Sequence, residues 1–264
     1  VYKRQAGFSS FEVLAYRWGI ASLTLVVFGI MLGETFRISR KDWGTVFILS
    51  LLRAATSFSL VIAYQNIASG VASTIHFMYP VLTTLIMMIF FHEKKSLWRM
   101  AAIALAVAGV FFLSNGDGTG SVTWSGIFIV LLSALGYALY LVTVSQLKNL
   151  EMKGLKMTFY VFLFGGILLF TGTEISGIGL QAIPDRTTLG NLVMLALVPT
   201  VISNLALVRA IKNIGSTLTS VLGAMEPVTA VCVGIAIFGE PFTRSIALGI
   251  LLIISAVTVI ILKR

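Results

Sequence analysis

Ionisable side chains inside apolar stretches are the residues of this sequence best placed to do chemistry. Arg53, His76 and Glu226 lie deep in long apolar runs. A charge at the centre of a bilayer costs at least about 2.5 kcal/mol, so each needs a partner or a task. We expect Arg53 to meet a carboxylate, a carbonyl cluster or an anionic ligand group. Glu226 could neutralise Arg53, carry a proton or bind a substrate amine; the alternative is a protonated or hydrogen-bonded structural role.

Two further ionisable residues, Glu12 and Arg17, lie nearer the end of their apolar run. A long arginine side chain can place its charge at the membrane interface. We therefore expect Arg17 to be structural.

Polar and aromatic residues recur at helical spacing beside these groups, which places them on shared helix faces. The alternative for the hydroxyls and amides is hydrogen bonding between helices, and for the tyrosines it is packing. The residues predicted to bind a substrate are Arg53, Ser57, His76, Tyr79, Tyr137, Tyr140, Asn204 and Glu226.

Prolines interrupt two of these apolar runs. A proline within a helix removes the hydrogen bond to the carbonyl four residues back. Pro80 and Pro227 should therefore free the carbonyls of His76 and Gly223. We predict that both prolines are hinges beside a cavity, since broken backbone at bilayer depth is tolerated where it lines one. The alternative is a packing kink.

The positions of these residues follow from an internal duplication. Residues 60–113 align with residues 207–260 without a gap, at a constant offset of 147. Rare residue types match in this register, including Asn66/Asn213, Pro80/Pro227 and Glu93/Glu240. The offset also pairs residues that differ, which we assign to the cavity: Arg53/Thr200, Ser57/Asn204, His76/Gly223 and Tyr79/Glu226. A duplicated apolar chain is typical of transporters built from repeats.

Composition places the whole chain in a membrane. Hydrophobic residues make up 58% and charged residues 11%, against roughly 45–50% and about 25% in soluble domains. Lipid cannot hydrogen-bond a bare backbone, so the predicted class is an all-α integral membrane protein. The predicted spans are residues 11–32, 43–64, 68–91, 98–114, 124–147, 155–173, 189–210, 214–238 and 243–262.

The net charge of +9 reports topology and not a nucleic-acid partner. One set of alternate loops carries thirteen of the basic residues: Arg37, Arg40, Lys41, Lys94, Lys95, Arg99, Lys148, Lys153, Lys156, Arg209, Lys212, Lys263 and Arg264. The positive-inside rule places this set and the C-terminus in the cytoplasm.

Nine spans then leave the first residue outside, so we expect a preceding tenth helix to be missing. The predicted domains are two inverted five-helix repeats. Residues 1–115 form the first with four helices, and residues 116–264 form the second with five.

Other chemistries have little support. Cys232 is the only cysteine, and we expect it to be a small core hydrophobe. His76 and His92 are the only histidines, and no metal-ligand spacing, phosphate loop or activated nucleophile is visible. We predict no catalytic residue, metal or cofactor. The acids Glu93 and Glu240 each precede a span, where we expect a structural helix cap.

The sequence resembles the EamA family of the drug/metabolite transporter superfamily. The resemblance covers nearly the whole chain and rests on Phe11–Arg17, Tyr79-Pro80-Val81 followed by Phe91-His92-Glu93, and Glu226-Pro227-Val228 followed by Phe238-Gly239-Glu240. It implies ten helices in two inverted repeats, cytoplasmic termini, and transport of amino acids, other metabolites or drugs, often outward. This chain departs from that pattern at the first helix.

We therefore predict a multi-pass cell-membrane permease that moves a small polar metabolite by alternating access, with export favoured. The partners are the substrate and the lipid bilayer, and a homodimer is a candidate assembly. A lipid flippase or a membrane subunit is the alternative, and an intramembrane enzyme ranks below both.

Overall fold

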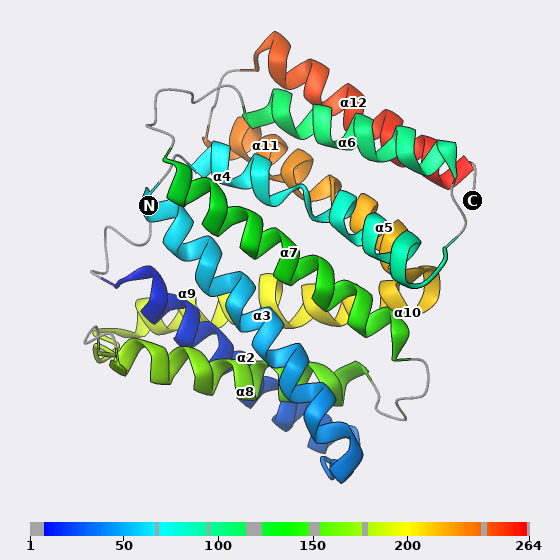
Figure 1. Ribbon diagram of the computed structural model, residues 1–264. Coiled ribbons are helices and arrows are strands. Elements are labelled where there is room, and N and C mark those ends of the chain that lie inside the picture. The colour runs from blue at the N-terminus through cyan, green and yellow to red at the C-terminus, as the bar shows by residue number, and fades with distance from the viewer. Residues whose placement is uncertain are drawn as a thin grey trace.

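The computed structural model describes residues 8–66, 69–93, 96–114, 123–147, 154–175, 179–238 and 242–262. These residues form helices and no strands. In chain order the helices are α2 (Ser10–Met31), α3 (Arg40–Asn66), α4 (Ser69–His76), α5 (Tyr79–Phe90), α6 (Leu97–Ser114), α7 (Trp124–Gln146), α8 (Gly154–Ile175), α9 (Arg186–Ala196), the π-helical turn η1 (Leu197–Ile202), α10 (Ser203–Leu222), α11 (Met225–Phe238) and α12 (Arg244–Leu262) (Figure 1).

Five stretches of helix are long and apolar enough to cross a membrane: Ser10–Met31, Arg40–Asn66, Trp124–Gln146, Gly154–Glu174 and Arg186–Leu222. Shorter apolar helices are Tyr79–Phe90, Leu97–Phe112 and Arg244–Val259. All nine predicted spans coincide with helical segments, although some of these are broken. The chain is an all-α integral membrane protein, as predicted.

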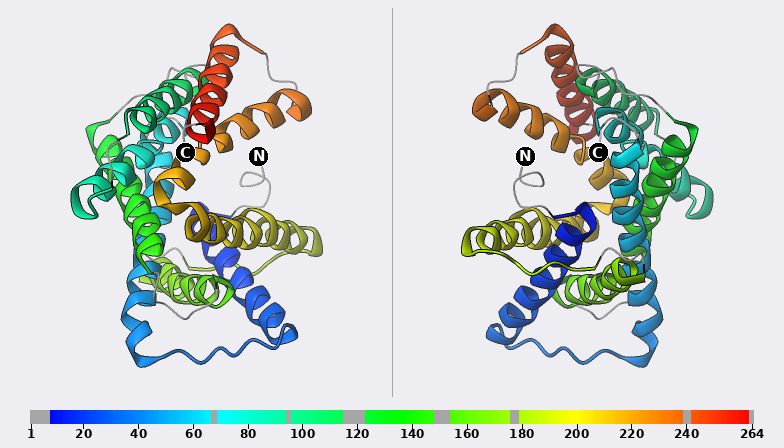
Figure 2. Two further views of the ribbon diagram at one scale, coloured as in Figure 1. Left: turned by 90° about the vertical axis from the view of Figure 1, so that its right-hand side faces the viewer. Right: turned by 90° about the vertical axis from the view of Figure 1, so that its left-hand side faces the viewer.

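The helices form two packed groups joined by α7. α6 lies along α12, α2 along α8, and α3 against both α7 and α8 (Figure 1). Figure 2 shows α9 and α11 on one side of the molecule and α3 and α7 on the opposite side. Helices from both halves of the sequence therefore surround the middle of the protein.

Two predicted spans are broken at matching points. α4 and α5 are separated by a turn at residues 77–78, and α10 and α11 by a turn at residues 223–224. Pro80 then lies in the first turn of α5, and Pro227 in that of α11, where a missing N–H is tolerated. The predicted breaks are confirmed. The carbonyl of Gly223 is not free as expected, because it accepts the N–H of Glu226 at 3.0 Å.

A further helix break was not predicted. Gly215 has φ +84° and ψ 167° inside α10, a conformation that an L side chain rarely adopts. The offset of 147 pairs it with residue 68, which lies outside the described residues. The span predicted at 189–210 also contains the π-helical turn η1 around Pro199. Such turns often occur at functional sites.

Glycines let neighbouring helices approach closely. A Cβ on Gly136 would lie 2.8 Å from the Thr56 hydroxyl oxygen, and a Cβ on Gly165 would lie 2.1 Å from the Trp18 ring. Trp18 is 2% exposed and packs edge-on against Phe162. Small residues at such contacts are how membrane helices pack without a hydrophobic driving force.

The expectation for Cys232 is wrong. Cys232 is exposed on α11 and is not part of the core, since the outer surface of a membrane helix is itself apolar. Glu12 is 1% exposed and has several backbone partners. It forms a capping box with Ser9 at the start of α2, and its Oε1 also accepts the N–H of Gln181 at 2.9 Å.

Candidate substrate-binding cavity

A cavity of about 900 Å³ lies in the middle of the protein. Side chains from α2, α3, α4, α7, η1, α10 and α11 line it, so both halves of the sequence contribute. Of the eight predicted substrate-binding residues, seven are in its wall: Arg53, Ser57, His76, Tyr79, Tyr137, Asn204 and Glu226. The predicted hinge residue Pro227 also lines the cavity, whereas Pro80 is buried outside the lining.

The eighth residue, Tyr140, does not line the cavity. Its side chain is 1% exposed, and its ring centroid lies 5.8 Å from Cζ of Arg53. Tyr137 contacts the same guanidinium at 5.1 Å. Two aromatic rings one helical turn apart on α7 therefore hold Arg53 by cation–π contacts.

Arg53 has weak polar contacts for a charge at this depth. Its Nη2 lies 3.4 Å from Oδ1 of Asn204, a long hydrogen bond, and its Nε is buried without an acceptor. In the described part of the chain, no carboxylate lies within ion-pair distance of Arg53. The sequence suggested three possible partners for Arg53. The described residues supply no carboxylate, and an anionic group on a ligand remains a candidate.

Arg17 does not reach the interface as expected, because it is turned into the same cavity. Its Nη2 donates to Oγ1 of Thr200 at 2.9 Å, and its Nε lies 3.3 Å from the same oxygen. Thr200 in turn donates to the carbonyl of Leu195 at 2.9 Å, which fixes its hydroxyl as an acceptor for Arg17. The π-helical turn thus positions a second cation in the cavity wall.

His76 has one defined proton. Ser133 Oγ donates its only proton to the Thr56 carbonyl at 2.8 Å. The contact of 3.2 Å between Ser133 Oγ and His76 Nδ1 therefore requires Nδ1 to donate. In the neutral ring, Nε2 is then the acceptor. The imidazole also stacks on Tyr137 at 5.8 Å between ring centroids.

Tyr79 connects the two helix breaks. Its side chain is 4% exposed, and a Cβ on Gly223 would lie 2.1 Å from its hydroxyl oxygen. Only glycine leaves room for the tyrosine there. The repeat offset pairs Gly223 with His76. The second half therefore has a glycine where the first half has a histidine, and the space beside that glycine holds Tyr79 of the first half.

Asn204 and Glu226 complete the polar wall. Asn204 is 4% exposed and donates from Nδ2 to the Thr200 carbonyl at 2.8 Å, which turns Oδ1 toward Arg53. Glu226 is exposed in the first turn of α11, where the helix dipole favours a negative charge. Of the described residues that line the cavity, it is the only acidic one.

Sequence reasoning missed Arg17 as a cavity residue, and the signal for it was its charge inside an apolar run. Thr200 was assigned to the cavity through the repeat offset, which pairs it with Arg53, and it does line the cavity. The orientation of both side chains depends on η1, and the sequence did not predict that turn.

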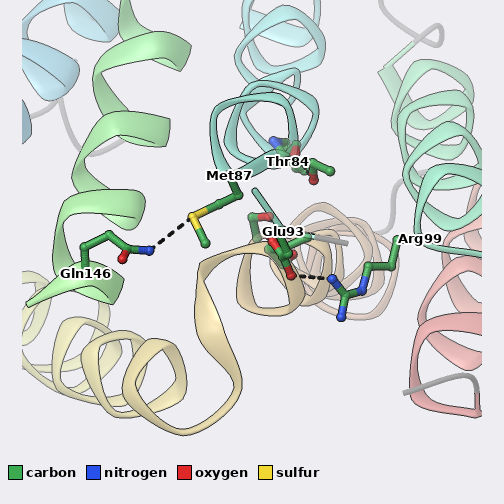
Figure 3. A network of polar contacts seen from close by, with 8 residues as sticks. Thr84, Met87, Glu93, Arg99 and Gln146 are labelled. Carbon is green, nitrogen blue, oxygen red and sulfur yellow. Dashed lines mark hydrogen bonds and ion pairs between the residues drawn. The ribbon is translucent and has the colours of Figure 1, made fainter. Parts of the chain in front are cut away.

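A second polar network lies away from the cavity, at the end of α5. Glu93 forms an ion pair with Arg99 at the start of α6, and its Oε2 accepts a hydrogen bond of 2.7 Å from Thr217 on α10. Figure 3 shows the Glu93–Arg99 pair and the nearby contact of 3.5 Å between Gln146 Nε2 and Met87 Sδ. The expected helix cap at Glu93 is instead a connection between the two halves.

A smaller apolar pocket of about 400 Å³ lies between α2 and α8 and has no charged residue in its lining. Among the described residues, no group of three His, Cys, Asp or Glu side chains could hold a metal ion. Of these two pockets, the central cavity is the one lined by charged and polar side chains.

The fold defines a multi-pass membrane protein with a polar cavity at its centre, an arrangement typical of membrane transporters. Residues 1–115 and 124–262 each match the EamA-like transporter family. The chain belongs to this family, as its sequence motifs suggested.

Curated relatives agree with this assignment. The uncharacterized inner membrane transporter YedA of Escherichia coli strain K12 is 25% identical over 249 residues, which are 94% of this chain and 80% of YedA. The uncharacterized transporter YdfC of Bacillus subtilis strain 168 is 25% identical over 246 residues, covering 92% and 79%. A crystal structure with 16% identity superposes with a TM-score of 0.85 over 97% of this chain and 90% of the other, which supports the fold.

Proposed function

We propose that this membrane transporter is a secondary permease that exports a small polar metabolite, such as an amino acid or a drug, by alternating access. The observation that carries the proposal is the 900 Å³ cavity, whose lining contains arginines, a histidine, tyrosines and a carboxylate. Its size suits a small molecule, and few polar groups among apolar ones are typical of ligand sites.

Alternating access requires the two halves to move against each other around the site. The breaks at residues 77–78 and 223–224 supply the flexible points in this proposal, with Pro80 and Pro227 beside them. The halves correspond to residues 1–115 and 116–264, as two inverted repeats with the C-terminus in the cytoplasm. Substrate binding would shift the equilibrium between inward-open and outward-open states.

The test is a comparison of metabolites inside and outside cells that overexpress the protein, with an empty-vector strain and an Arg53→Gln strain as references. We expect one compound class to fall inside the cells and rise in the medium, only with the unmodified protein. Identical metabolite profiles in all three strains, at equal membrane levels of protein, would contradict the proposal.

The cavity also supports a second candidate, a flippase for an amphiphilic lipid-linked substrate. Several lining side chains are exposed, including Ser73, Ser203 and Glu226, so the cavity is not sealed. A fluorescent lipid assay in proteoliposomes separates the two. Protein-dependent lipid movement without metabolite flux would favour the flippase.

A further inference from the structure

We propose that the substrate carries an oxyanion, from a carboxylate or a phosphate group, and that Arg53 and Arg17 bind it. This inference rests on the proposed function, because it names the chemical class of the molecule that the cavity would carry.

The first argument is the incomplete bonding of Arg53. A guanidinium has five N–H donors in a planar fork. Asn204 offers one acceptor at 3.4 Å, and Nε is buried with none. Cζ lies 5.1 Å from the centroid of the Tyr137 ring and 5.8 Å from that of the Tyr140 ring, and these ring contacts supply no oxygen acceptor for the N–H groups. A carboxylate or phosphate oxyanion in the cavity would accept hydrogen bonds from the guanidinium through two of its oxygens.

The second argument is the excess of positive charge. Arg17 lines the same cavity, and the acceptor found for it is the neutral hydroxyl of Thr200. In the ranges that the structure describes, neither arginine has a carboxylate within ion-pair distance. Two arginines that line one cavity repel each other, and Glu226, which also lines the cavity, forms no ion pair with either of them among the described residues. A bound anion would lower this repulsion.

The third argument concerns the rest of the substrate. Apolar and aromatic side chains complete the cavity wall beside the arginines, among them Leu14, Trp18, Phe162 and Tyr137. Such a wall favours an apolar body next to the charged end. The substrate class is therefore an organic oxyanion with an apolar or aromatic part, and not a fully hydrated inorganic ion.

The test measures binding to the purified protein with three probes that share a phenyl ring. These are 3-phenylpropionate, its neutral analogue 3-phenylpropionamide, and phenyl phosphate. We expect at least one anion to bind at least about tenfold more tightly than the amide, since charge-assisted hydrogen bonds are the stronger ones. The anion that binds identifies the source of the oxyanion.

Variants connect this preference to the arginines. Arg53→Gln should weaken binding of the preferred anion by about tenfold or more and leave amide binding unchanged. Arg53→Lys should restore only part of the affinity, because an ammonium lacks the planar fork. Arg186→Gln removes the same charge from an exposed position on α9 and should have no effect. If Arg53→Gln does not fold, anion binding to Arg17→Gln tests the same inference, and it should be weakened as well.

Equal binding of acid, phosphate and amide, or an unchanged anion affinity in folded Arg53→Gln and Arg17→Gln, would overturn the inference. These results are distinguishable from failure of the proposed function. Arginine-dependent anion binding without flux in proteoliposomes would reject transport and keep the inference. Flux of neutral or cationic compounds that ignores both arginine variants would reject the inference and keep transport.

Discussion

Arg53 and Arg99 both belong to the first half of the chain and lie near residues of the second half, yet they differ in how well their charges are paired. Arg99 lies at the end of the bundle, with 30% of its side chain exposed, and pairs with Glu93, which also accepts a bond from Thr217. Arg53 lies in the central cavity with one long bond to Asn204 and an unsatisfied Nε.

The difference is informative because the arginine with the larger desolvation free energy has the weaker polar contacts. An unpaired charge near water has little effect on stability, whereas an unpaired charge at bilayer depth is strongly destabilising. Arg99, near water, has an ion-pair partner, whereas Arg53, at depth, has none among the described residues. Stability alone would not produce that arrangement, so we infer that the end network maintains the fold and the cavity arginine serves a ligand.

The largest effect should come from Arg53→Gln. Loss of a charge-assisted contact with the substrate should lower transport by about 10- to 100-fold. Flux into proteoliposomes at matched protein levels measures this. Transport within twofold of the unmodified protein would place Arg53 with the structural charges and remove the contrast.

A steric change to the cavity wall should come next. Gly165→Ala places a Cβ 2.1 Å from the Trp18 ring and should cost about 1–3 kcal/mol as the tryptophan is displaced. Gly166→Ala is a matched control, since its nearest neighbour would be at an ordinary 3.6 Å. Melting curves of both variants check the prediction. Similar loss in the two would show that the close contact between position 165 and Trp18 is not what destabilises the variant.

Glu226→Gln tests the negative end of the cavity. If this carboxylate carries a proton or binds a substrate amine, transport should fall about tenfold and lose its dependence on pH. Flux measured across a range of pH values, at normal membrane levels, decides this. Unchanged transport at every pH would assign Glu226 a structural role, leaving the arginines as the functional charges of the cavity.

Glu93→Gln should have a smaller effect, on stability. It removes a partly exposed ion pair, which is worth at most about 1 kcal/mol, and keeps an acceptor for Thr217. The melting temperature should fall slightly while substrate affinity stays the same. A large loss of affinity would mean that the end network also controls the cavity.

The smallest effect should come from Asp185→Ala, at the start of α9. Thr188 donates to both carboxylate oxygens of Asp185, through its backbone N–H at 2.6 Å and its hydroxyl at 3.0 Å. These bonds lower the pKa of Asp185 below its usual 3.8. Its stabilisation is therefore present above that value and lost as pH falls through the lowered pKa. The gap in melting temperature between variant and unmodified protein should shrink in acid.

The fold was largely predictable because the physics is local. Bilayer depth requires about 20 apolar residues in a helix, and a proline removes a specific hydrogen bond. The duplication then paired residues far apart in sequence, and the aligned positions Arg53, Ser57, His76, Tyr79, Asn204 and Glu226 do line one cavity.

The rest depended on backbone geometry and side-chain direction. The π-helical turn and the positive φ of Gly215 were not visible in the apolar pattern. Arg17 has a long side chain that could reach the interface or the cavity, and only the position of Thr200 decides between them. Tyr140 shares a helix face with Tyr137 but lies one turn further along α7. There it contacts Arg53 without lining the cavity.

The most direct test of the contrast is a melting experiment on three proteins, each with and without the preferred phenyl anion. Without ligand, Arg53→Gln should melt at or above the unmodified protein, because an unpaired buried charge has been removed. With ligand it should gain much less stability than the unmodified protein, because its affinity for the anion is lower. Arg99→Gln should melt lower, by about 2 °C, and keep the full ligand-induced shift. A strongly destabilised Arg53→Gln that still gains as much stability from the anion as the unmodified protein would contradict the account.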